Sequence, residues 1–432
     1  MEKKLLYDTH EKPKTGQLII LALQHVFAMF GATILVPLLV NEAAGTTVLT
    51  IPVTLVMSGI GTLIYILCTK GKSPVYLGSS FAYIVPMVAA FAKDGNSGVA
   101  TGIIAVGIIY ILFSFLIKLF GKSWIDKLLP PIVIGPMIMI IGLALAPNAI
   151  EQIGLSSGVV EWKSLLVALI AFLVTVLTSV GAKGFLKVIP FLMGIISGYI
   201  AAIFLGMVDF TSVGDAKFFE IPKFLLPFKD YTFSLAGLLT IAPIALVTIA
   251  EHIGDHMALG AIIDKDLIKD PGLEKTLLGD GLGTSIAGLF GGPASTTYGE
   301  NTSVVGMTKV ASVWVIGTAA IIAICMGFLG KISAIFATIP NPILGGVSLL
   351  LYGFISVNGL KVLVKNQIDF ENIRNVIIAS TMLVLGLGGA VLTLETGDIS
   401  ISINGMSLAA IVGILLNQFL PNKEKQETIK TK

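Results

Sequence analysis

Long apolar segments run through this sequence from one end to the other, and they restrict the fold more than any other feature. Most approach the roughly 20 residues that a helix needs to span hydrocarbon, or have apolar flanks that bring them there. The segments are 18–40, 55–67, 103–120, 132–146, 165–180, 188–208, 235–250, 313–329, 347–355, 376–394 and 408–420. Only 12% of the residues are charged, against about 25% in soluble domains. The pattern predicts an all-α polytopic membrane protein and excludes a β-barrel, whose spans are about 10 residues of alternating polarity.

Loop charges indicate how the spans are oriented. Shorter candidates at 81–91, 283–290 and 300–309 bring the count to about fourteen spans. In that register most Lys and Arg residues fall on one side, whereas the opposite loops are acidic or neutral. Mild exceptions are Lys93, Lys163 and Lys331. The positive-inside rule then predicts that both termini are cytoplasmic. Residues 1–16 are polar and do not read as a cleavable signal.

Two short polar motifs interrupt the apolar chain at membrane depth. The first reads Gly-Ser-Ser-Phe-Ala at 78–82, and the second reads Ser-Thr-Thr-Tyr-Gly at 295–299. Each has a small residue, two hydroxyls, an aromatic ring and a second small residue. A matched pair of interruptions is the best sequence-level indication of a transporter binding site.

Further echoes indicate an internal duplication. Gln24-His25 is answered by Glu251-His252, and Gly-Lys at 121–122 is answered by Gly-Lys at 330–331, with prolines following both. Each half would contain seven spans. Because seven is odd, the second half begins on the opposite side of the membrane from the first, so the two halves are inverted relative to each other. The substrate site is then expected near the bilayer midplane, where the halves meet.

Ionisable residues within the apolar spans are candidates for function. Glu251 and Asp255 are four residues apart and share a helix face, and a carboxylate at the centre of a membrane helix costs about 2.5–3.5 kcal/mol. For His256, Asp255 and Glu251 the alternative is a solvated helix end. For Glu300 it is a solvated loop carboxylate that stabilises the N-terminus of a half-helix. Asp280 is either a helix N-cap or an intramembrane group, and Glu300 directly follows the second motif.

These residue types suit a flat, neutral, polar ring. Carboxylates accept ring N–H bonds, backbone N–H groups at broken helices donate to carbonyls, and aromatic side chains stack on the ring face. A buried acid is also a natural proton carrier, because loss of water favours its neutral form. His25, inside the first span, is either a hydrogen-bonded packing group or a proton carrier.

Several other classes of function lack support in the sequence. No Cys or His spacing fits a metal site, no glycine-rich stretch fits a phosphate loop, and no nucleophile–base pair is evident. The sequence therefore predicts no metal, no cofactor, no enzymatic activity and no nucleic-acid partner. Cys68 and Cys325 are expected to pack as small apolar residues.

The motifs together resemble a known family. The stretches at 24–33, 76–82, 250–254 and 296–301 are similar to those of bacterial uracil permeases, in the nucleobase–ascorbate transporter family of nucleobase–cation symporters. The resemblance implies fourteen spans in a seven-plus-seven inverted repeat, with a short β-strand in each of spans 3 and 10. It also implies uracil import coupled to protons by alternating access, in a homodimer surrounded by lipid in the bacterial inner membrane.

The resemblance also implies a core domain and a gate domain, each built from both halves of the chain. The core domain is expected at 17–122 and 232–330, and the gate domain at 123–231 and 331–421. Cytoplasmic tails are expected at 1–16 and 422–432.

Position by position, the resemblance assigns a substrate site. Glu251 and Glu300 match the substrate-binding carboxylates, Phe81 and Tyr298 match residues that flank the base, and Gly299 offers a backbone contact.

Further residues support this site or are candidates to carry the proton. The supporting polar residues are Gln24, His25 and Asn301. The candidates for proton coupling are Glu300, Asp255, Glu251, Asp280 and His256.

The sequence departs from the family at two positions. Asp255, with His256 beside it, replaces a histidine found in some uracil permeases, and Ser303 stands where the family usually has glycine. A xanthine or other purine or pyrimidine base symporter of the same fold is the main alternative. An anion transporter of this architecture would be expected to place a cation at the site, where this chain offers acids.

Overall fold

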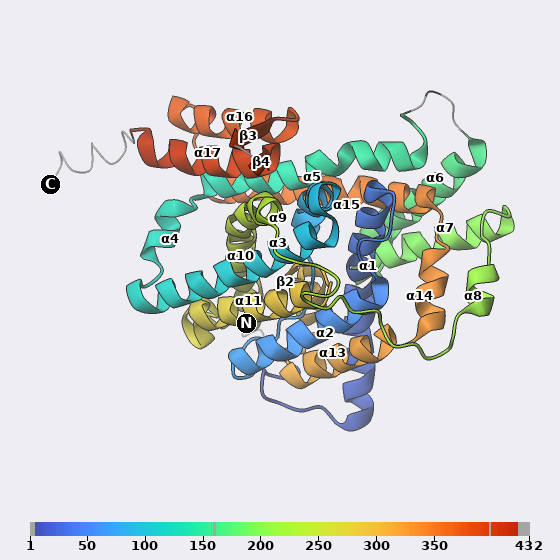
Figure 1. The fold of residues 1–432 in the computed structure, drawn as a ribbon. Helices are drawn as coiled ribbons and strands as arrows, with labels where there is room; N and C mark the ends of the chain where they lie inside the picture. Colours follow the sequence, from blue (N-terminus) through green and yellow to red (C-terminus); the bar gives the residue numbers. More distant parts are fainter. Residues whose placement is uncertain (1–4, 157, 159–160, 397–398, 422–432) are drawn as a thin grey trace.

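The computed structural model describes residues 5–156, 158, 161–396 and 399–421, so the predicted C-terminal tail, 422–432, lies outside the described residues. Within these ranges, seven helices are long and apolar enough to cross a membrane, and a further pair, bent by 78°, passes the same test together. The chain therefore has a mostly helical, polytopic membrane-type fold (Figure 1).

The described residues of the first half form eight α-helices and one strand. They are α1 (Thr15–Ala44), α2 (Ile51–Cys68), β1 (Leu77–Ser79), α3 (Ile84–Phe120), α4 (Ser123–Leu128), α5 (Pro131–Ile153), α6 (Trp162–Gly181), α7 (Pro190–Phe204) and α8 (Thr211–Asp215). A 3-10 turn, Phe81–Tyr83, joins β1 to α3. The long α3 is really two helices, because Asp94 and Gly95 have non-helical backbone angles inside it.

In the part of the second half that the structure describes there are nine α-helices and three strands. They are α9 (Leu235–Ile241), α10 (Ala245–Ile263), α11 (Leu273–Leu289), β2 (Ser295–Thr297), α12 (Gly299–Thr308), α13 (Val313–Gly327), α14 (Gly330–Ala337), α15 (Asn341–Lys365), α16 (Ile373–Leu387), β3 (Val391–Thr396), β4 (Ile399–Asn404) and α17 (Gly405–Phe419). A 3-10 turn with Pro243 separates α9 from α10, since proline cannot supply the N–H that an uninterrupted helix needs.

Proline and glycine mark several of the helix ends. Thr50 caps α2 by accepting from the Val53 N–H, and a proline follows in the first turn. α5 begins at Pro131 and ends before Gly154, which has the left-handed conformation. Both are favoured positions, because proline lacks an N–H that the first turn does not use and glycine tolerates positive φ.

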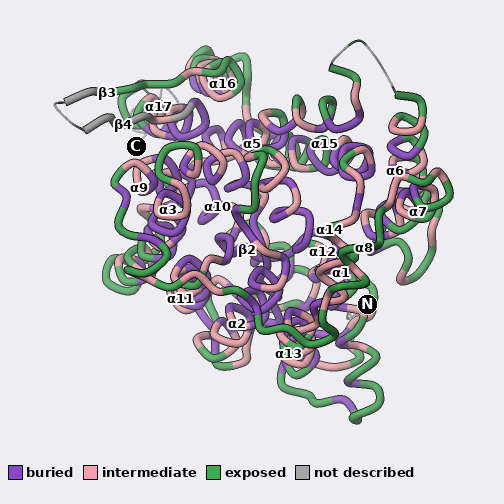
Figure 2. Tube along the Cα trace, turned by 45° about the vertical axis from the view of Figure 1, so that its right-hand side comes forward, coloured by how far each residue is buried: buried purple, intermediate pink, exposed green. Residues whose placement is uncertain are grey.

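The helices pack in two groups, and the strands β1 and β2, which pair with each other, contact α1, α2, α10 and α11. In one group α2 packs along α13, and α3 packs along α11 and α9. In the other, α5 packs along α15, and α6 along α7 and α15. β2 lies in the interior of the bundle in both views (Figures 1 and 2), and buried residues gather around it (Figure 2).

An unpredicted hairpin lies close to the C-terminus. The apolar segment 376–394 was expected to be one continuous membrane helix, but α16 ends at Leu387 and β3 pairs with β4 in antiparallel register. The expectation of a helix through this whole segment is wrong, because Gly388 and Gly389 follow and Gly389 has a φ of 71°. β3 reads Val-Leu-Thr-Leu-Glu-Thr, and its β-branched residues favour a strand.

Candidate functional site

The two interrupted motifs meet in the structure. β1 and β2 pair in antiparallel register, with Gly78 opposite Thr296. The pairing continues on both sides, because the Tyr298 N–H donates to the Tyr76 carbonyl at 3.1 Å and the Ser80 N–H donates to the Ala294 carbonyl at 3.0 Å. Segments from the two halves of the chain therefore form one continuous wall.

Hydroxyl groups on α2 hold β1 in place from the other side. The Leu77 N–H donates to Thr62 Oγ1 at 2.9 Å, and the Leu77 carbonyl accepts from Ser58 Oγ at 3.1 Å and Thr62 Oγ1 at 3.2 Å. These bonds satisfy backbone groups that would otherwise be unpaired in an apolar interior.

A cavity of about 660 Å³ adjoins this wall. Residues of β2, α10, α12 and the turn after β1 line one side, and residues of α5, α7 and α15 line the other. From the first side come Phe81, Ala82, Glu251, Asp255, Thr296, Thr297, Tyr298, Gly299, Glu300, Ser303 and Met307. The structure thus brings together all five substrate-site residues expected from the sequence.

Three carboxylates face this cavity. Glu251 and Asp255 lie one turn apart on α10, and Glu300 lies in the first turn of α12. The Thr297 hydroxyl of β2 donates a hydrogen bond to the Asp255 carboxylate. The N-terminus of α12 favours negative charge at Glu300, because the helix dipole is positive there. Lys187 is the cationic residue of the lining.

The Tyr298 ring is fixed against β1 and α1. Its hydroxyl lies 3.1 Å from Thr33 Oγ1 and 3.2 Å from Ser79 Oγ. A Cβ at Gly78 would lie 2.2 Å from two ring carbons of Tyr298. Glycine is therefore required at position 78 for this ring to pack on the strand. The role of Thr33 was missed, since a single threonine in an apolar helix carries no distinguishing signal.

Asn301 and His25 connect α12 to α1. The Asn301 amide nitrogen lies 3.2 Å from the His25 carbonyl oxygen and 3.1 Å from His25 Nδ1. His25 is buried and does not line the cavity, which favours the packing role over a proton carrier. Gln24 is half-buried, and its Oε1 has no partner among the described residues.

Asp280 and His256 lie away from the cavity lining. Asp280 is fully buried within α11, so it is no N-cap, and its Oδ2 lies 3.0 Å from His252 Nδ1. His256 is fully buried and not solvated. Its Nδ1 is 2.7 Å from the His252 carbonyl oxygen, and its Nε2 contacts the Tyr65 hydroxyl. Residues four apart on α10 stay on one side, so Glu251 and Asp255 line the cavity while His252 and His256 lie in the interior. The sequence spacing alone could not show which pair lies on which side.

The departure at Ser303 has a local explanation. Its hydroxyl donates to the Gly299 carbonyl at 2.9 Å, one turn earlier in α12, and the side chain is exposed to the cavity. Such bonds to the preceding turn occur within helices and bend them slightly, so serine fits here without displacing a neighbour.

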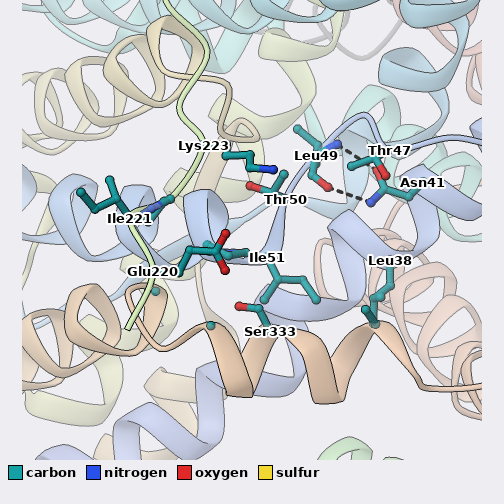
Figure 3. A pocket seen from close by; sticks show the side chains of 15 residues that line it. Leu38, Asn41, Thr47, Leu49, Thr50, Ile51, Glu220, Ile221, Lys223 and Ser333 are labelled. Atoms are coloured by element: carbon teal, nitrogen blue, oxygen red, sulfur yellow. Dashed lines mark hydrogen bonds between the residues drawn. The ribbon is translucent and has the colours of Figure 1, made fainter. Parts of the chain in front are cut away.

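A second cavity, of about 290 Å³, lies between the end of α1, the start of α2, α14 and the segment 220–223 (Figure 3). The Asn41 amide donates to the Leu49 carbonyl at 2.7 Å and shapes one wall (Figure 3). On the neighbouring part of α1, the Phe30 ring packs edge-on against Phe336 of α14, with centroids 4.9 Å apart.

A cavity between two helix groups, with broken helices at its wall, is typical of membrane transporters, and solved structures share the fold. The transmembrane domain of the cyanobacterial bicarbonate transporter BicA is 17% identical, with a TM-score of 0.59 over 94% of this chain and 98% of that one. The murine anion transporter Slc26a9 is 11% identical, with a TM-score of 0.66 over 95% of this chain and 69% of that one.

Sequence comparison identifies the family. The permease family matches residues 16–395. The uracil permease of Bacillus subtilis is 45% identical over 99% of this chain and 98% of its own length, and that of Escherichia coli K12 is 42% identical over 94% and 92%. The chain belongs to this permease family, as the resemblance predicted, and is a transporter rather than an enzyme.

Proposed function

We propose that this chain imports uracil together with protons by alternating access. The observation that carries the proposal is the convergence of three carboxylates and two aromatic residues from both halves of the chain on one cavity. The names of its relatives, uracil permeases of 42–46% identity, support the choice of substrate.

The cavity offers complementary groups for each edge of uracil. In the proposed pose, Glu251 and Glu300 accept the ring N–H groups through charge-assisted bonds. The Gly299 N–H, at the start of α12, has no partner within the helix and donates to a ring carbonyl. Phe81 and Tyr298 flank the ring. A Cβ at Gly299 would meet nothing within 4 Å, so this backbone is open to a ligand.

Proton coupling follows from the crowding of acids. Carboxylates that share a poorly solvated site repel one another when all are ionised, so a proton on one of them is favourable. Glu300, Glu251 and Asp255 line the cavity and are the first candidates. Asp280 and His256 remain candidates only for a route through the interior of the bundle, because they do not reach the cavity.

Helix packing supports the proposed fourteen spans in two inverted halves. In the proposed repeat, α2 corresponds to α11, and α13 corresponds to the second part of α3. Accordingly, α2 packs along α13, and α11 packs along α3. The repeat would also relate the pair α6 and α7 to the pair α16 and α17, and both pairs are again in contact. α5 and α15, which the repeat relates to each other, pack along their lengths.

The proposed core and gate domains give the cavity its position. The core comprises 17–122 and 232–330, the gate comprises 123–231 and 331–421, and the cavity is lined from both. In the proposed orientation, with cytoplasmic termini, it lies toward the cytoplasm and the smaller cavity toward the outside. The contact between Phe30 and Phe336 would then close the outer side of the transporter, and it is the outer seal of this proposal. A homodimer in the bacterial inner membrane completes the proposal.

Uptake of labelled uracil into vesicles, with and without an imposed proton gradient, tests this function. We expect accumulation only with the gradient, and loss of gradient-driven accumulation in Glu300→Gln. Glu371→Gln, an exposed residue outside the cavity, is the matched control. Accumulation that ignores the gradient would contradict proton coupling, and normal transport by Glu300→Gln would remove that residue from the site.

A purine such as xanthine is the second candidate, because a cavity of about 660 Å³ also has room for two fused rings. Competition by a series of unlabelled bases distinguishes the two. Uracil is expected to compete best; failure of uracil to compete would favour the purine.

A further inference from the structure

Residues 5–14, the N-terminal strap, precede α1 and lie across the C-terminal ends of α10 and α12, the two helices that carry the site carboxylates. The strap runs beside the segment 309–313 that follows α12. The Leu6 N–H donates to the Lys309 carbonyl at 2.7 Å, the Ala311 N–H to the Tyr7 carbonyl at 2.8 Å, and the Val313 N–H to the Thr9 carbonyl at 3.0 Å. These bonds form a short ladder between segments about 300 residues apart.

Side chains extend the attachment to α10. Lys265, two residues beyond the end of α10, contacts the Asp8 carboxylate and lies 3.0 Å from Thr9 Oγ1. The Ser312 hydroxyl donates to the Glu11 carbonyl at 2.6 Å. Burial raises the pKa of the Asp8 carboxyl, but the bonds from Lys265 and the Thr9 N–H outweigh it and leave the pKa below its ordinary value.

An apolar cluster underlies the strap. Leu5 packs against buried residues of α2, β1, α10, α12 and the segments that follow them: Tyr65, Val75, Leu77, Leu259, Ile263, Leu267, Val305 and Ala311. The strap therefore covers an apolar cluster to which β1, α10 and α12 all contribute.

We propose that the strap positions α10 against α12, and so sets the spacing between Glu251 and Glu300. α10 carries Glu251 and Asp255, and α12 carries Glu300. α12 is only 10 residues long, and the strap binds directly beyond its end. Asp8, Thr9 and Lys265 are thus positioning residues that touch no substrate. The inference rests on the proposed function, because it concerns the same binding site.

Calorimetric titration of purified protein with uracil tests the strap. Lys265→Met removes the link to α10, and we expect uracil affinity to fall about two- to fivefold, as for a partly exposed ion pair. Deletion of residues 2–9 removes the ladder as well, and we expect a loss of about fivefold or more. The exchange Asp8→Lys with Lys265→Asp should recover most of the affinity lost in Lys265→Met. Lys269→Met, an exposed lysine four residues on, is the control and should bind normally.

Transport kinetics separate positioning from a general structural role. We expect the strap variants to raise KM for uracil while the maximal rate per folded transporter changes less than about twofold. Lower amounts of protein with unchanged KM and affinity would overturn the proposal, as would failure of the exchanged pair to recover binding. If the unaltered chain itself does not bind uracil, the proposed function fails instead, and the two outcomes remain distinct.

Discussion

Gly78→Ala tests whether β1 holds the Tyr298 ring in position for substrate binding. The new Cβ would lie 2.2 Å from two ring carbons and 2.5 Å from the hydroxyl oxygen of Tyr298. Carbon atoms in contact are ordinarily about 3.5–4.0 Å apart, so the ring has to move by more than about 1 Å. Such a shift would also break the hydroxyl contacts to Thr33 and Ser79.

The magnitude follows from the contact that is lost. Stacking of an aromatic side chain on a base contributes about 1–3 kcal/mol, and 1.4 kcal/mol corresponds to tenfold in affinity. We expect the dissociation constant for uracil to rise about five- to 150-fold in Gly78→Ala. Overpacking of this kind costs about 1–3 kcal/mol of stability, so the variant should still fold.

Calorimetric titration with uracil measures the change, and thermal unfolding in detergent checks that the protein is folded. Gly306→Ala is the matched control, because a Cβ there meets only Ile262 side-chain atoms at 3.5 Å and beyond. Binding of uracil by folded Gly78→Ala at the affinity of the unaltered chain would refute the argument that Tyr298 is held in place by this strand.

Three further variants probe other contacts. Thr297→Val removes the hydroxyl bonded to Asp255 and should lower the free energy of unfolding by about 1–3 kcal/mol, measured by thermal or chemical denaturation; unchanged stability would contradict that bond. The bond from Lys72 lowers the pKa of the exposed Asp270, so this pair stabilises the fold above the ordinary carboxyl pKa of about 3.9 and loses its effect as pH falls through the lowered value. The difference in Tm between Lys72→Met and the unaltered chain should therefore be constant from about pH 5 to 8 and shrink below about pH 4. Phe336→Ala removes one ring of the outer seal, and an aromatic pair is worth about 0.5–1.5 kcal/mol. Opening toward the outside should become easier by that amount, so the external uracil concentration for half-maximal transport should fall about two- to tenfold. An unchanged concentration for half-maximal transport, measured from either side of the membrane, would argue against a seal.

The sequence predicted the convergence of the two motifs and the acids well, because its signal is local and duplicated. The two motifs, the helical spacing of Glu251 and Asp255, and Glu300 beside the second motif all lead to one cavity. Charge in an apolar span is costly, so each acid there is a candidate from the sequence alone.

Other features depend on contacts between distant segments and leave little trace in the sequence. The interior position of His256 results from its contacts with Tyr65 and the His252 carbonyl, and helix periodicity could not decide between interior and solvent. The strap reads as a polar tail because most of its bonds use backbone groups, which every residue has. Gly388 and Gly389 interrupt an apolar run whose composition alone favours a membrane helix.

The pairing of β1 with β2 imposes an order of events on biogenesis. Leu77 leaves the ribosome well over 200 residues before its partner, Thr297, so the growing chain must hold an unpaired strand inside the bilayer, where exposed backbone groups are costly. The hydroxyls of Ser58 and Thr62, which belong to the same half, already bond both backbone groups of Leu77. The newly inserted first half can therefore present a preformed template edge, on which the second half completes the site late in synthesis.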